Sequence, residues 1–240
     1  MNIKKEDIQI MFEDNHLLVA VKPQNVPSQE DETKDPDMLT LLKEYLKEKY
    51  LKEGNAFLGL VHRLDRPTGG VMVFAKTSKA AARLSESIKD GDFEKTYFAV
   101  VDGVPREKNA RLTHYLLKNE EQNVVRIVPQ ATAGAKKAEL NYKVLETLHE
   151  RTLSLLNINL LTGRGHQARV QTSAIGTPIY GDHRYGKARP GSNLALWAAV
   201  LKFPHPVTGK TMVFIAYPPE NEVPWNKFDI SKYLNINKEI

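Results

Sequence analysis

Residues 61–70 read Val-His-Arg-Leu-Asp-Arg-Pro-Thr-Gly-Gly, and the apolar run Val71–Lys76 follows them directly. A run of this kind, entered through glycines, predicts a buried strand that begins at a tight turn. Asp65 lies on the turn between Arg63 and Arg66. Nearby positive charge favours the ionised form of a carboxylate, and an ionised carboxylate held in place can act as a nucleophile or base. An ordinary exposed Asp–Arg pair would leave the same pattern, so other segments must decide between the two interpretations.

The composition of the chain is that of a globular protein: its 240 residues are 41% hydrophobic and 26% charged. There is no cysteine, which excludes disulfides, thiolate metal sites and cysteine nucleophiles and fits the reducing cytoplasm. No apolar run is long enough to predict a membrane span, and the charged first residues do not resemble a signal peptide. We therefore expect a cytoplasmic protein that does not bind membranes.

Charge is distributed unevenly along the chain. The net charge is +5, yet residues 1–58 carry 8 basic and 12 acidic side chains. Residues 161–210 carry seven basic side chains against Asp182 alone. A basic segment in an otherwise more acidic chain is typical of a protein that binds a polyanion. Solvated surface charges are the alternative, unless a functional motif falls within the segment.

Hydrophobic periodicity predicts more strand than helix. The expected strands cover residues 8–12, 17–22, 71–76, 93–101, 111–117, 124–129, 137–147, 152–161, 193–203 and 211–217, and the expected helices cover 38–51, 78–88 and 166–175. Regular strand–helix alternation is absent. This favours an α+β protein with a mostly antiparallel, mixed β-sheet core and a few flanking helices. No linker or repeat interrupts the pattern, so we expect one catalytic domain over residues 1–240.

Two further segments carry candidate functional residues. Lys95 and Tyr97 stand two apart on an expected strand, so both side chains face one side. An aromatic ring beside a cation suits a nucleobase and its phosphate, although a tyrosine in a sheet core would look the same. Residues 161–171 lead from a strand end through the glycine-flanked Arg164 into a helix. A helix N-terminus favours anions, and an arginine placed there can bind a carboxylate through two hydrogen bonds.

These segments resemble the motifs of the RluA-type family of RNA pseudouridine synthases. Residues 62–70 resemble its nucleophile motif, Lys95–Tyr97 its K-x-Y motif, and residues 162–171 its T-G-R-x-H-Q-x-R-V-H motif. Residues 176–186 and 201–210 resemble two more, and the likeness covers about residues 8–218 in the family's order. Gln171, Trp197 and Gly69 depart from the usual residues. Because the motif of Asp65 begins early in the sequence, we do not expect the small N-terminal RNA-binding module that many relatives carry.

The resemblance implies a fold, a reaction and roles for residues. It implies the pseudouridine synthase fold with a central RNA-binding cleft, and isomerisation of uridines in structured RNA, ribosomal or transfer, without a cofactor or metal. Asp65 would be the nucleophile, Tyr97 would pack on the flipped-out uracil, and Arg164 would pair with Asp65. We expect further RNA contacts from the basic residues of these segments, namely Arg63, Arg66, Lys95, Arg169, Arg184 and Lys187.

Other functions fit the sequence less well. The histidines never adopt a metal-binding spacing, and Gly209-Lys210-Thr211 lacks the first glycine of a phosphate-binding loop. A glycosidase would need a second acid near Asp65. A catalytically inactive RNA-binding protein remains the main alternative, although a pure binder has no use for a paired carboxylate among phosphate-binding groups. We expect a monomer.

Overall fold

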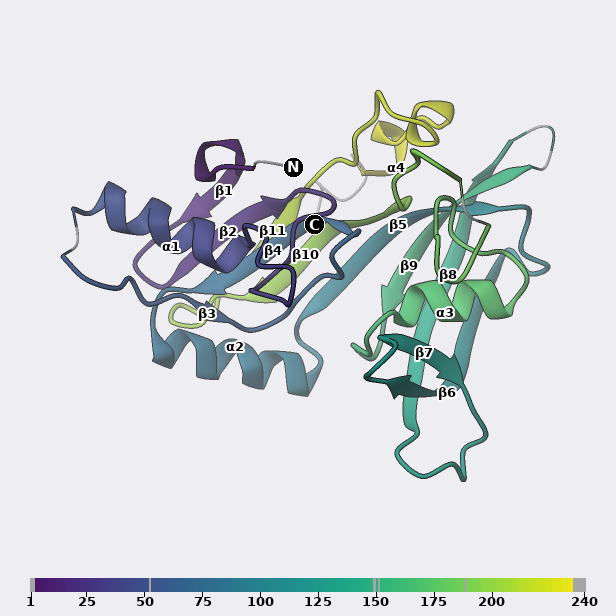
Figure 1. The fold of residues 1–240 in the computed structure, drawn as a ribbon, viewed down its shortest axis with the longest axis horizontal. Coiled ribbons are helices and arrows are strands. Elements are labelled where there is room, and N and C mark those ends of the chain that lie inside the picture. The colour runs from purple at the N-terminus through teal and green to yellow at the C-terminus, as the bar shows by residue number, and fades with distance from the viewer. Residues whose placement is uncertain (1–2, 52, 149, 151, 188, 235–240) are drawn as a thin grey trace. The chain divides into compact units, whose positions relative to one another are not determined.

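The computed structural model describes residues 3–51, 53–148, 150, 152–187 and 189–234. Within them the chain forms eleven β-strands and four α-helices. It divides into two compact units (Figure 1). The first comprises the residues up to Glu94 together with Val200–Ala216, and the second comprises Lys95–Ala199 and the residues from Tyr217 onward. The prediction of a single catalytic domain over residues 1–240 stays a prediction.

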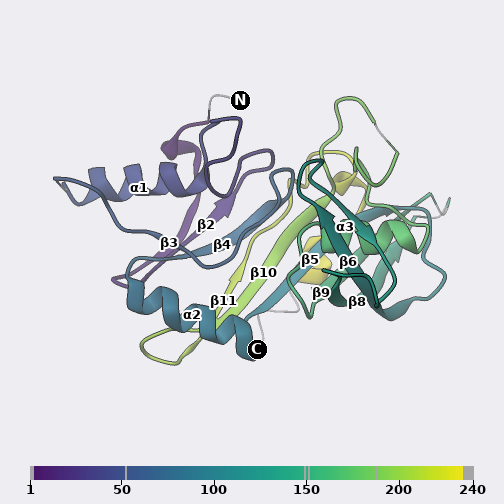
Figure 2. The ribbon, with the colours of Figure 1, turned by 60° about the horizontal axis from the view of Figure 1, so that its bottom comes forward.

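The first unit is built on antiparallel strands. β2 (Leu17–Lys22) pairs with both β1 (Ile10–Glu13) and β4 (Gly69–Ala75), and the short β3 (Gly59–Leu60) pairs with the end of β4. β11 (Thr211–Ile215) runs antiparallel beside the last residues of β10 (Leu196–Pro204), as Figure 2 shows. Every residue of β4 is buried, as the apolar run of the sequence predicts.

Two helices complete the first unit. α2 (Ser78–Asp90) begins at the cap Thr77, whose side chain accepts the Ala80 N–H, and ends at Gly91 in the left-handed conformation. α2 and these strands share one apolar core, which includes Val73, Leu84 and Phe203. α1 (Met38–Lys49) follows β2 after a long loop, and a single 3-10 turn, η1 (Lys5–Asp7), precedes β1.

Glu13 ties α1 to the strands. Its carboxylate pairs with Lys49 at 2.7 Å and with Lys76 at 2.6 Å, and it also accepts hydrogen bonds from Tyr45 and Tyr50. Burial would raise the pKa of the Glu13 carboxyl, but these four partners lower it to about 2.

The second unit contains the longer strands. In the strand order β5-β9-β8-β6-β7, each of the neighbouring pairs is antiparallel. The strands are β5 (Glu94–Asp102), β6 (Asn109–Asn119), β7 (Val124–Ile127), β8 (Lys136–Thr147) and β9 (Leu153–Leu160). The first residue of β5, Glu94, belongs to the first unit. β5 and β9 are neighbours in the sheet although three strands separate them along the chain, so Tyr97 of β5 lies opposite Ile158 of β9.

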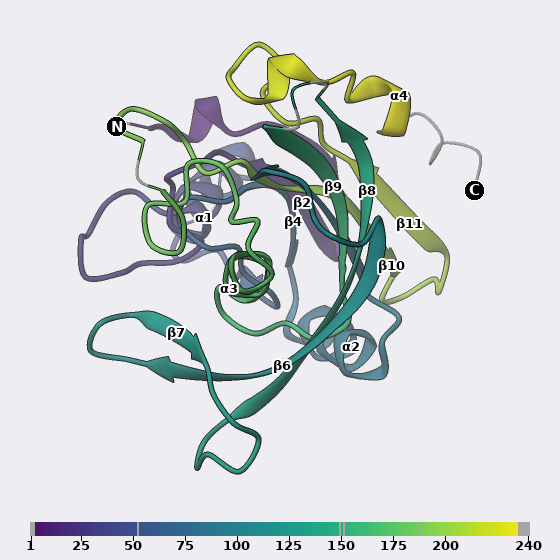
Figure 3. The same ribbon diagram turned by 90° about the vertical axis from the view of Figure 1, so that its right-hand side faces the viewer.

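Helix α3 (Gln167–Ala174) packs against the strands of the second unit. Val170 on this helix shares a core with Leu116, Val125 and Ala138. Figure 3 shows α3 end-on, with β6 and β7 curling around it. After α3 a long irregular segment leads to β10, whose first residues, 196–199, belong to this unit. The 3-10 turn η2 (Trp225–Lys227) and the short α4 (Ser231–Leu234) follow.

The predicted α+β class is confirmed, because antiparallel strands dominate and helices are few. The three helices that the periodicity predicts all occur, each within two residues of its expected bounds. Strand β3 was not predicted, since two residues are too few to show a period. In the part of the chain that the structure describes, no helix is long and apolar enough to cross a membrane.

Candidate active site

Asp65 lies in the first unit, on the turn between β3 and β4. The turn closes through a hydrogen bond from the Thr68 N–H to the Asp65 carbonyl at 2.9 Å. Leu64 and Thr68 on either side are buried, whereas Asp65 is half-buried. Because Leu64 and Thr68 are buried, the backbone at Asp65 is fixed in place. Because Asp65 itself is partly exposed, its carboxylate is accessible to a reactant.

Lys22 is a functional candidate that the sequence did not reveal. Its side chain is fully buried, and Nζ donates to the carbonyls of Pro23, Val26 and Arg66 at 3.0, 2.6 and 3.0 Å. Burial lowers the pKa of the Lys22 ammonium to about 7, while the negative charge of Asp65 acts in the opposite direction. A buried cation therefore lies within electrostatic reach of Asp65. The sequence does not predict this contact, because a lysine at a strand end, directly before Pro23, carries no pattern that indicates burial.

Arg66 and Arg63 differ in their surroundings. The Arg66 guanidinium pairs with Asp31 at 3.5 Å and with Asp35, and it donates to Thr33 Oγ1 at 2.9 Å. These three residues belong to the acidic loop that follows β2. Arg63 is exposed. A phosphate at Arg66 would have to displace carboxylates, whereas one at Arg63 meets an exposed arginine.

Lys95 and Tyr97 lie at the start of β5 in the second unit. The Tyr97 side chain is buried, and Lys95 is half-buried. Burial lowers the pKa of the Lys95 ammonium. A Cβ added to Gly163 would lie 3.9 Å from Lys95 Nζ. The Lys95 ammonium therefore lies near the loop that carries Arg164.

Arg164 lies on an exposed turn between β9 and α3. Gln167 holds this turn, because its Oε1 accepts the Arg164 N–H at 3.0 Å and its Nε2 donates to the Glu139 carbonyl at 2.9 Å. His166 adopts the left-handed conformation, with φ of 53°, and its Nδ1 lies 2.6 Å from the Tyr185 hydroxyl. Arg164 Nε donates to the Lys137 carbonyl at 3.0 Å. The backbone around this arginine is therefore fixed, and its exposed side chain is held at the Lys137 carbonyl through Nε.

Arg169, predicted to contact RNA, instead has a structural position. Its guanidinium is buried and donates twice to the carboxylate of Asp182, each time at 2.8 Å. Asp182 is fully buried and also accepts the N–H groups of Arg184 and Tyr185. Burial would raise the pKa of the Asp182 carboxyl, but Arg169 and these N–H groups lower it. Reaching a phosphate would break this buried pair, so we remove Arg169 from the set of RNA contacts.

We expect Asp182→Ala to destabilise the protein by about 3–5 kcal/mol, because it leaves the buried Arg169 without its counter-charge. Urea unfolding at neutral pH measures this loss. Asp182 has a lowered pKa, so its contribution is fully present above the ordinary value of 3.8 and is lost as the pH falls through the lowered value. In a double-mutant cycle with Arg169→Met, the double variant should lose less than the sum of the singles. A loss below about 1 kcal/mol, the range of exposed pairs, would contradict a structural ion pair.

Several basic side chains of segment 161–210 already form ion pairs, so fewer of them are available to a polyanion than the composition suggests. Besides Arg169, Arg189 pairs with Asp102 at 2.9 Å and Lys202 pairs with Glu94 at 3.0 Å. Their partners lie outside the segment, so a count along the sequence could not find them. Arg184 is exposed and donates to the backbone carbonyl of Asn123, and Lys187 is exposed. The Asn123 carbonyl carries no net charge and does not neutralise Arg184. Arg184 and the exposed Lys187 therefore both present a positive charge to solvent.

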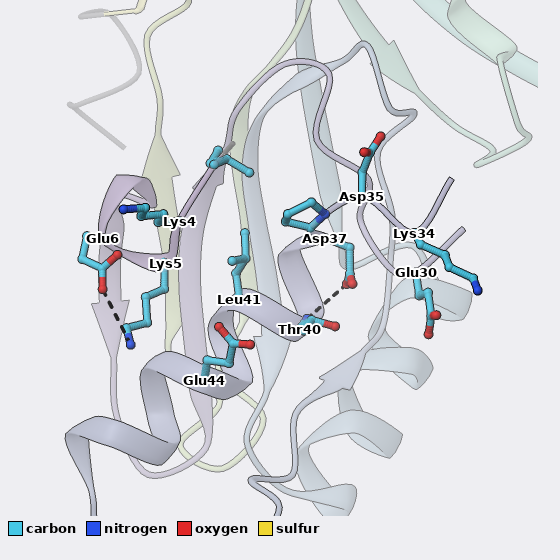
Figure 4. Close-up of a pocket in the computed structure, with 12 residues that line it drawn as sticks. Lys4, Lys5, Glu6, Glu30, Lys34, Asp35, Asp37, Thr40, Leu41 and Glu44 are labelled. Atoms are coloured by element: carbon cyan, nitrogen blue, oxygen red, sulfur yellow. Dashed lines mark hydrogen bonds and ion pairs between the residues drawn. The ribbon is translucent and has the colours of Figure 1, made fainter. Parts of the chain in front are cut away.

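The first unit also contains an open pocket of about 610 Å³ (Figure 4). Charges of both signs line it, among them Lys4, Lys34, Glu30 and Glu44. Asp37 on its wall caps helix α1 by accepting the Thr40 N–H at 3.1 Å. None of the candidate catalytic residues lines this pocket. Among the described residues, no group of three or more histidine, aspartate and glutamate side chains is placed to hold a metal ion.

Each unit therefore holds part of the predicted site. Asp65, Arg63 and Arg66 lie in the first unit, and Tyr97 and Arg164 lie in the second. Lys95, Arg184 and Lys187 also belong to the second unit. The structure brings the Lys95 and Arg164 segments together within their unit. The ion pair between Asp65 and Arg164 stays a prediction.

Comparison with protein families gives one match, over residues 16–174, to the family described as RNA pseudouridylate synthase. Among individual proteins, the chain is 37% identical over 213 residues to ribosomal large subunit pseudouridine synthase C of Escherichia coli. It is 35% identical over 211 residues to the protein of the same name from Vibrio vulnificus. Both alignments cover 85% of this chain but only 64% and 63% of the relatives, less than two thirds of their length.

A third relative is covered more fully. Ribosomal large subunit pseudouridine synthase D of Zymomonas mobilis is 32% identical over 229 residues, covering 89% of this chain and 70% of that protein.

Among solved structures, human RNA pseudouridylate synthase domain containing 4 matches with a TM-score of 0.74 at 23% identity, over 89% of both chains. Human domain containing 1 matches with a TM-score of 0.71 at 24% identity, over 91% of this chain and 86% of the other. At such identities the two structures establish a shared fold.

Proposed function

Because the chain belongs to the RNA pseudouridylate synthase family, we propose that it isomerises uridine to pseudouridine in large-subunit ribosomal RNA. One observation carries the proposal: the matched residues 16–174 include Asp65, Tyr97 and Arg164. By the resemblance of their segments to the family's motifs, these three are the residues to which we assign the catalytic roles. The proposal for ribosomal RNA rests on the names of the Escherichia and Vibrio relatives.

The reaction requires the base to leave the RNA stack. A uridine in folded RNA hides its reactive face, so the enzyme must flip it outward. Asp65 then attacks the nucleotide, and the bond between N1 and C1′ breaks. The uracil turns, C5 bonds to C1′, and the bond between Asp65 and the nucleotide breaks, which restores the carboxylate. The C5 proton leaves and N1 takes up a proton. Atoms balance without an oxidant, a reductant or a second substrate, since the product is an isomer of the starting nucleotide.

The other residues act on the base and on the charge of Asp65. Tyr97 packs against the flipped uracil and assists removal of the C5 proton. Arg164 pairs with the Asp65 carboxylate and keeps it ionised, because a guanidinium matches the two oxygens of a carboxylate. Lys95 lies beside the Arg164 loop and adds positive charge there. Support comes from the nearness of Lys95 Nζ to Gly163, where an added Cβ would lie 3.9 Å from it.

The RNA contacts that we propose use exposed basic side chains. Arg63, Arg184 and Lys187 meet phosphates directly, and Arg66 does so after leaving its carboxylate partners. We also propose a cytoplasmic monomer, because the chain lacks cysteine and one copy supplies all three candidate catalytic residues. Transfer RNA is the second substrate to test.

Tritium release tests the proposed reaction. A transcript of Escherichia coli large-subunit ribosomal RNA, labelled with tritium at C5 of uridine, should lose tritium to water when the protein is added. A catalytically inactive RNA-binding protein would bind the transcript without releasing tritium. A nucleoside hydrolase would release free uracil. Labelled transfer RNA, tested in parallel, would show whether that class of RNA is the better substrate.

Replacing Arg184 and Lys187 by alanine should make RNA binding less sensitive to salt. Each charge that neutralises a phosphate releases counterions, so the slope of log K against log salt should fall by about one to two. Titrations between low and physiological salt measure this slope. Arg189→Ala is the matched control, because that arginine is already paired with Asp102 and should contribute less. An unchanged slope in the double variant would show that these charges lie away from the RNA.

A further inference from the structure

The backbone around Asp65 is held at four consecutive carbonyl groups, those of residues 64–67. Each accepts one hydrogen bond. The donors, in order, are Ser28 Oγ, the Thr68 N–H, Lys22 Nζ and Gln24 Nε2, at 2.8, 2.9, 3.0 and 3.2 Å. Three of the four donors are side chains from residues 22–28, which lie 36 to 44 residues earlier in the chain. A turn that needed only to reverse the chain would require just the hydrogen bond from Thr68.

Ser28 makes the most specific of these contacts. Its hydroxyl donates to the Leu64 carbonyl at 2.8 Å and accepts the Leu64 N–H at 3.1 Å, so it pairs with both backbone groups of one residue. Met72 Sδ lies 3.8 Å away, and the much shorter distance to the Leu64 oxygen decides where the hydroxyl proton points. The side chain is only 5% exposed. The hydroxyl and both of its bonds to Leu64 are therefore shielded from bulk water.

The Leu64 carbonyl belongs to the peptide plane that leads into Asp65. Because a peptide unit is planar, fixing its oxygen also fixes the direction of the Asp65 N–Cα bond. On the other side of Asp65, Lys22 fixes the carbonyl of Arg66. Ser28 thus holds the peptide unit that enters Asp65, the Thr68 N–H holds the unit that leaves it, and Lys22 holds the next unit, between Arg66 and Pro67. Neither Ser28 nor Lys22 needs to touch the substrate to do so.

We propose that Ser28 is a positioning residue for Asp65, setting the direction from which the carboxylate meets the nucleotide. The inference rests on the proposed function, since it gives Asp65 the role of nucleophile. Reactions at a fixed centre are sensitive to small displacements: an error near 1 Å costs about a hundredfold in rate. Without the hydroxyl, the two Leu64 backbone groups lose their partners and the turn relaxes to satisfy them.

Two variants of nearly equal shape isolate the hydroxyl. Ser28→Thr keeps it and adds a methyl group, whereas Ser28→Val adds similar bulk without it. Tritium release from the C5-labelled ribosomal RNA transcript gives kcat and KM for each, below both melting temperatures. We expect Ser28→Val to lower kcat by about ten- to a hundredfold with KM unchanged. Ser28→Thr should stay within about threefold of the wild type.

Two further variants exclude overpacking, and the loss of a serine hydroxyl elsewhere in the unit, as causes of a lower kcat. Ser28→Ala cannot overpack the site and should lower kcat as Ser28→Val does. Ser85→Ala is the matched control, because Ser85 Oγ donates to the Ala81 carbonyl at 2.8 Å on helix α2 and its loss should leave kcat unchanged. Equal kcat in the Thr and Val variants, or wild-type kcat in the Ala variant, would overturn the positioning role alone. A wild-type protein that releases no tritium from either RNA would overturn the proposed function and this inference with it.

Discussion

Asp65→Asn should abolish tritium release, lowering the rate by at least about a thousandfold, while RNA binding survives. The amide has the shape of the carboxylate but is a very poor nucleophile. The turn should persist, because the hydrogen bonds that the backbone carbonyls of residues 64–67 accept are left in place by the substitution. Tritium release measured together with filter binding of the same transcript separates chemistry from affinity.

The control for this variant is another aspartate in the same unit. Asp90 ends helix α2 on the exposed surface, so Asp90→Asn changes the net charge equally without touching the turn. It should release tritium at the wild-type rate. Residual activity of Asp65→Asn above a few per cent of the wild type would show that a different group attacks the nucleotide.

Arg164→Ala should lower activity by about a hundredfold or more and move the acidic limb of the pH–activity profile upward. Without the guanidinium, the ionised form of the nucleophile loses its counter-charge, so a higher pH is needed to populate it. The fold should tolerate the change, because the side chain is exposed and Gln167 holds the turn through the backbone. Single-turnover rates over a range of pH measure both effects.

Two comparisons sharpen the Arg164 test. Arg164→Lys should restore only part of the activity, because an ammonium cannot bind both carboxylate oxygens as a guanidinium does. Arg106→Ala removes one exposed positive charge from the same unit and should leave the acidic limb in place. If Arg164→Ala kept the wild-type acidic limb, Arg164 would be an RNA contact rather than the partner of Asp65.

Local signals account for what the sequence predicts well. The cap at Thr77, the left-handed Gly91 and the apolar strand after Gly70 each act within a few residues, so α2 and β4 could be placed from the sequence alone. The motifs around Asp65, Tyr97 and Arg164 are likewise local. They name the candidate residues without any knowledge of the fold.

Long-range contacts account for what the sequence misses. Lys22 and Ser28 hold a turn some forty residues away, and nothing in Lys-Pro or Pro-Ser announces a buried donor. Arg169 has the same local context as an RNA-binding arginine, and only the fold shows that Asp182 occupies its guanidinium. The residues that support a reactive group are therefore harder to predict than the group itself.

The carboxylates around Arg66 affect what a salt titration can reveal. Asp31 and Asp35 already neutralise this arginine, so a phosphate that binds it exchanges one anionic partner for another. The two freed aspartates then stand near the RNA, and small cations gather around them as others leave the phosphate. The net number of ions released at this position is close to zero. The salt dependence of binding would therefore underestimate the number of arginines that contact the RNA, because a contact at Arg66 would not change it.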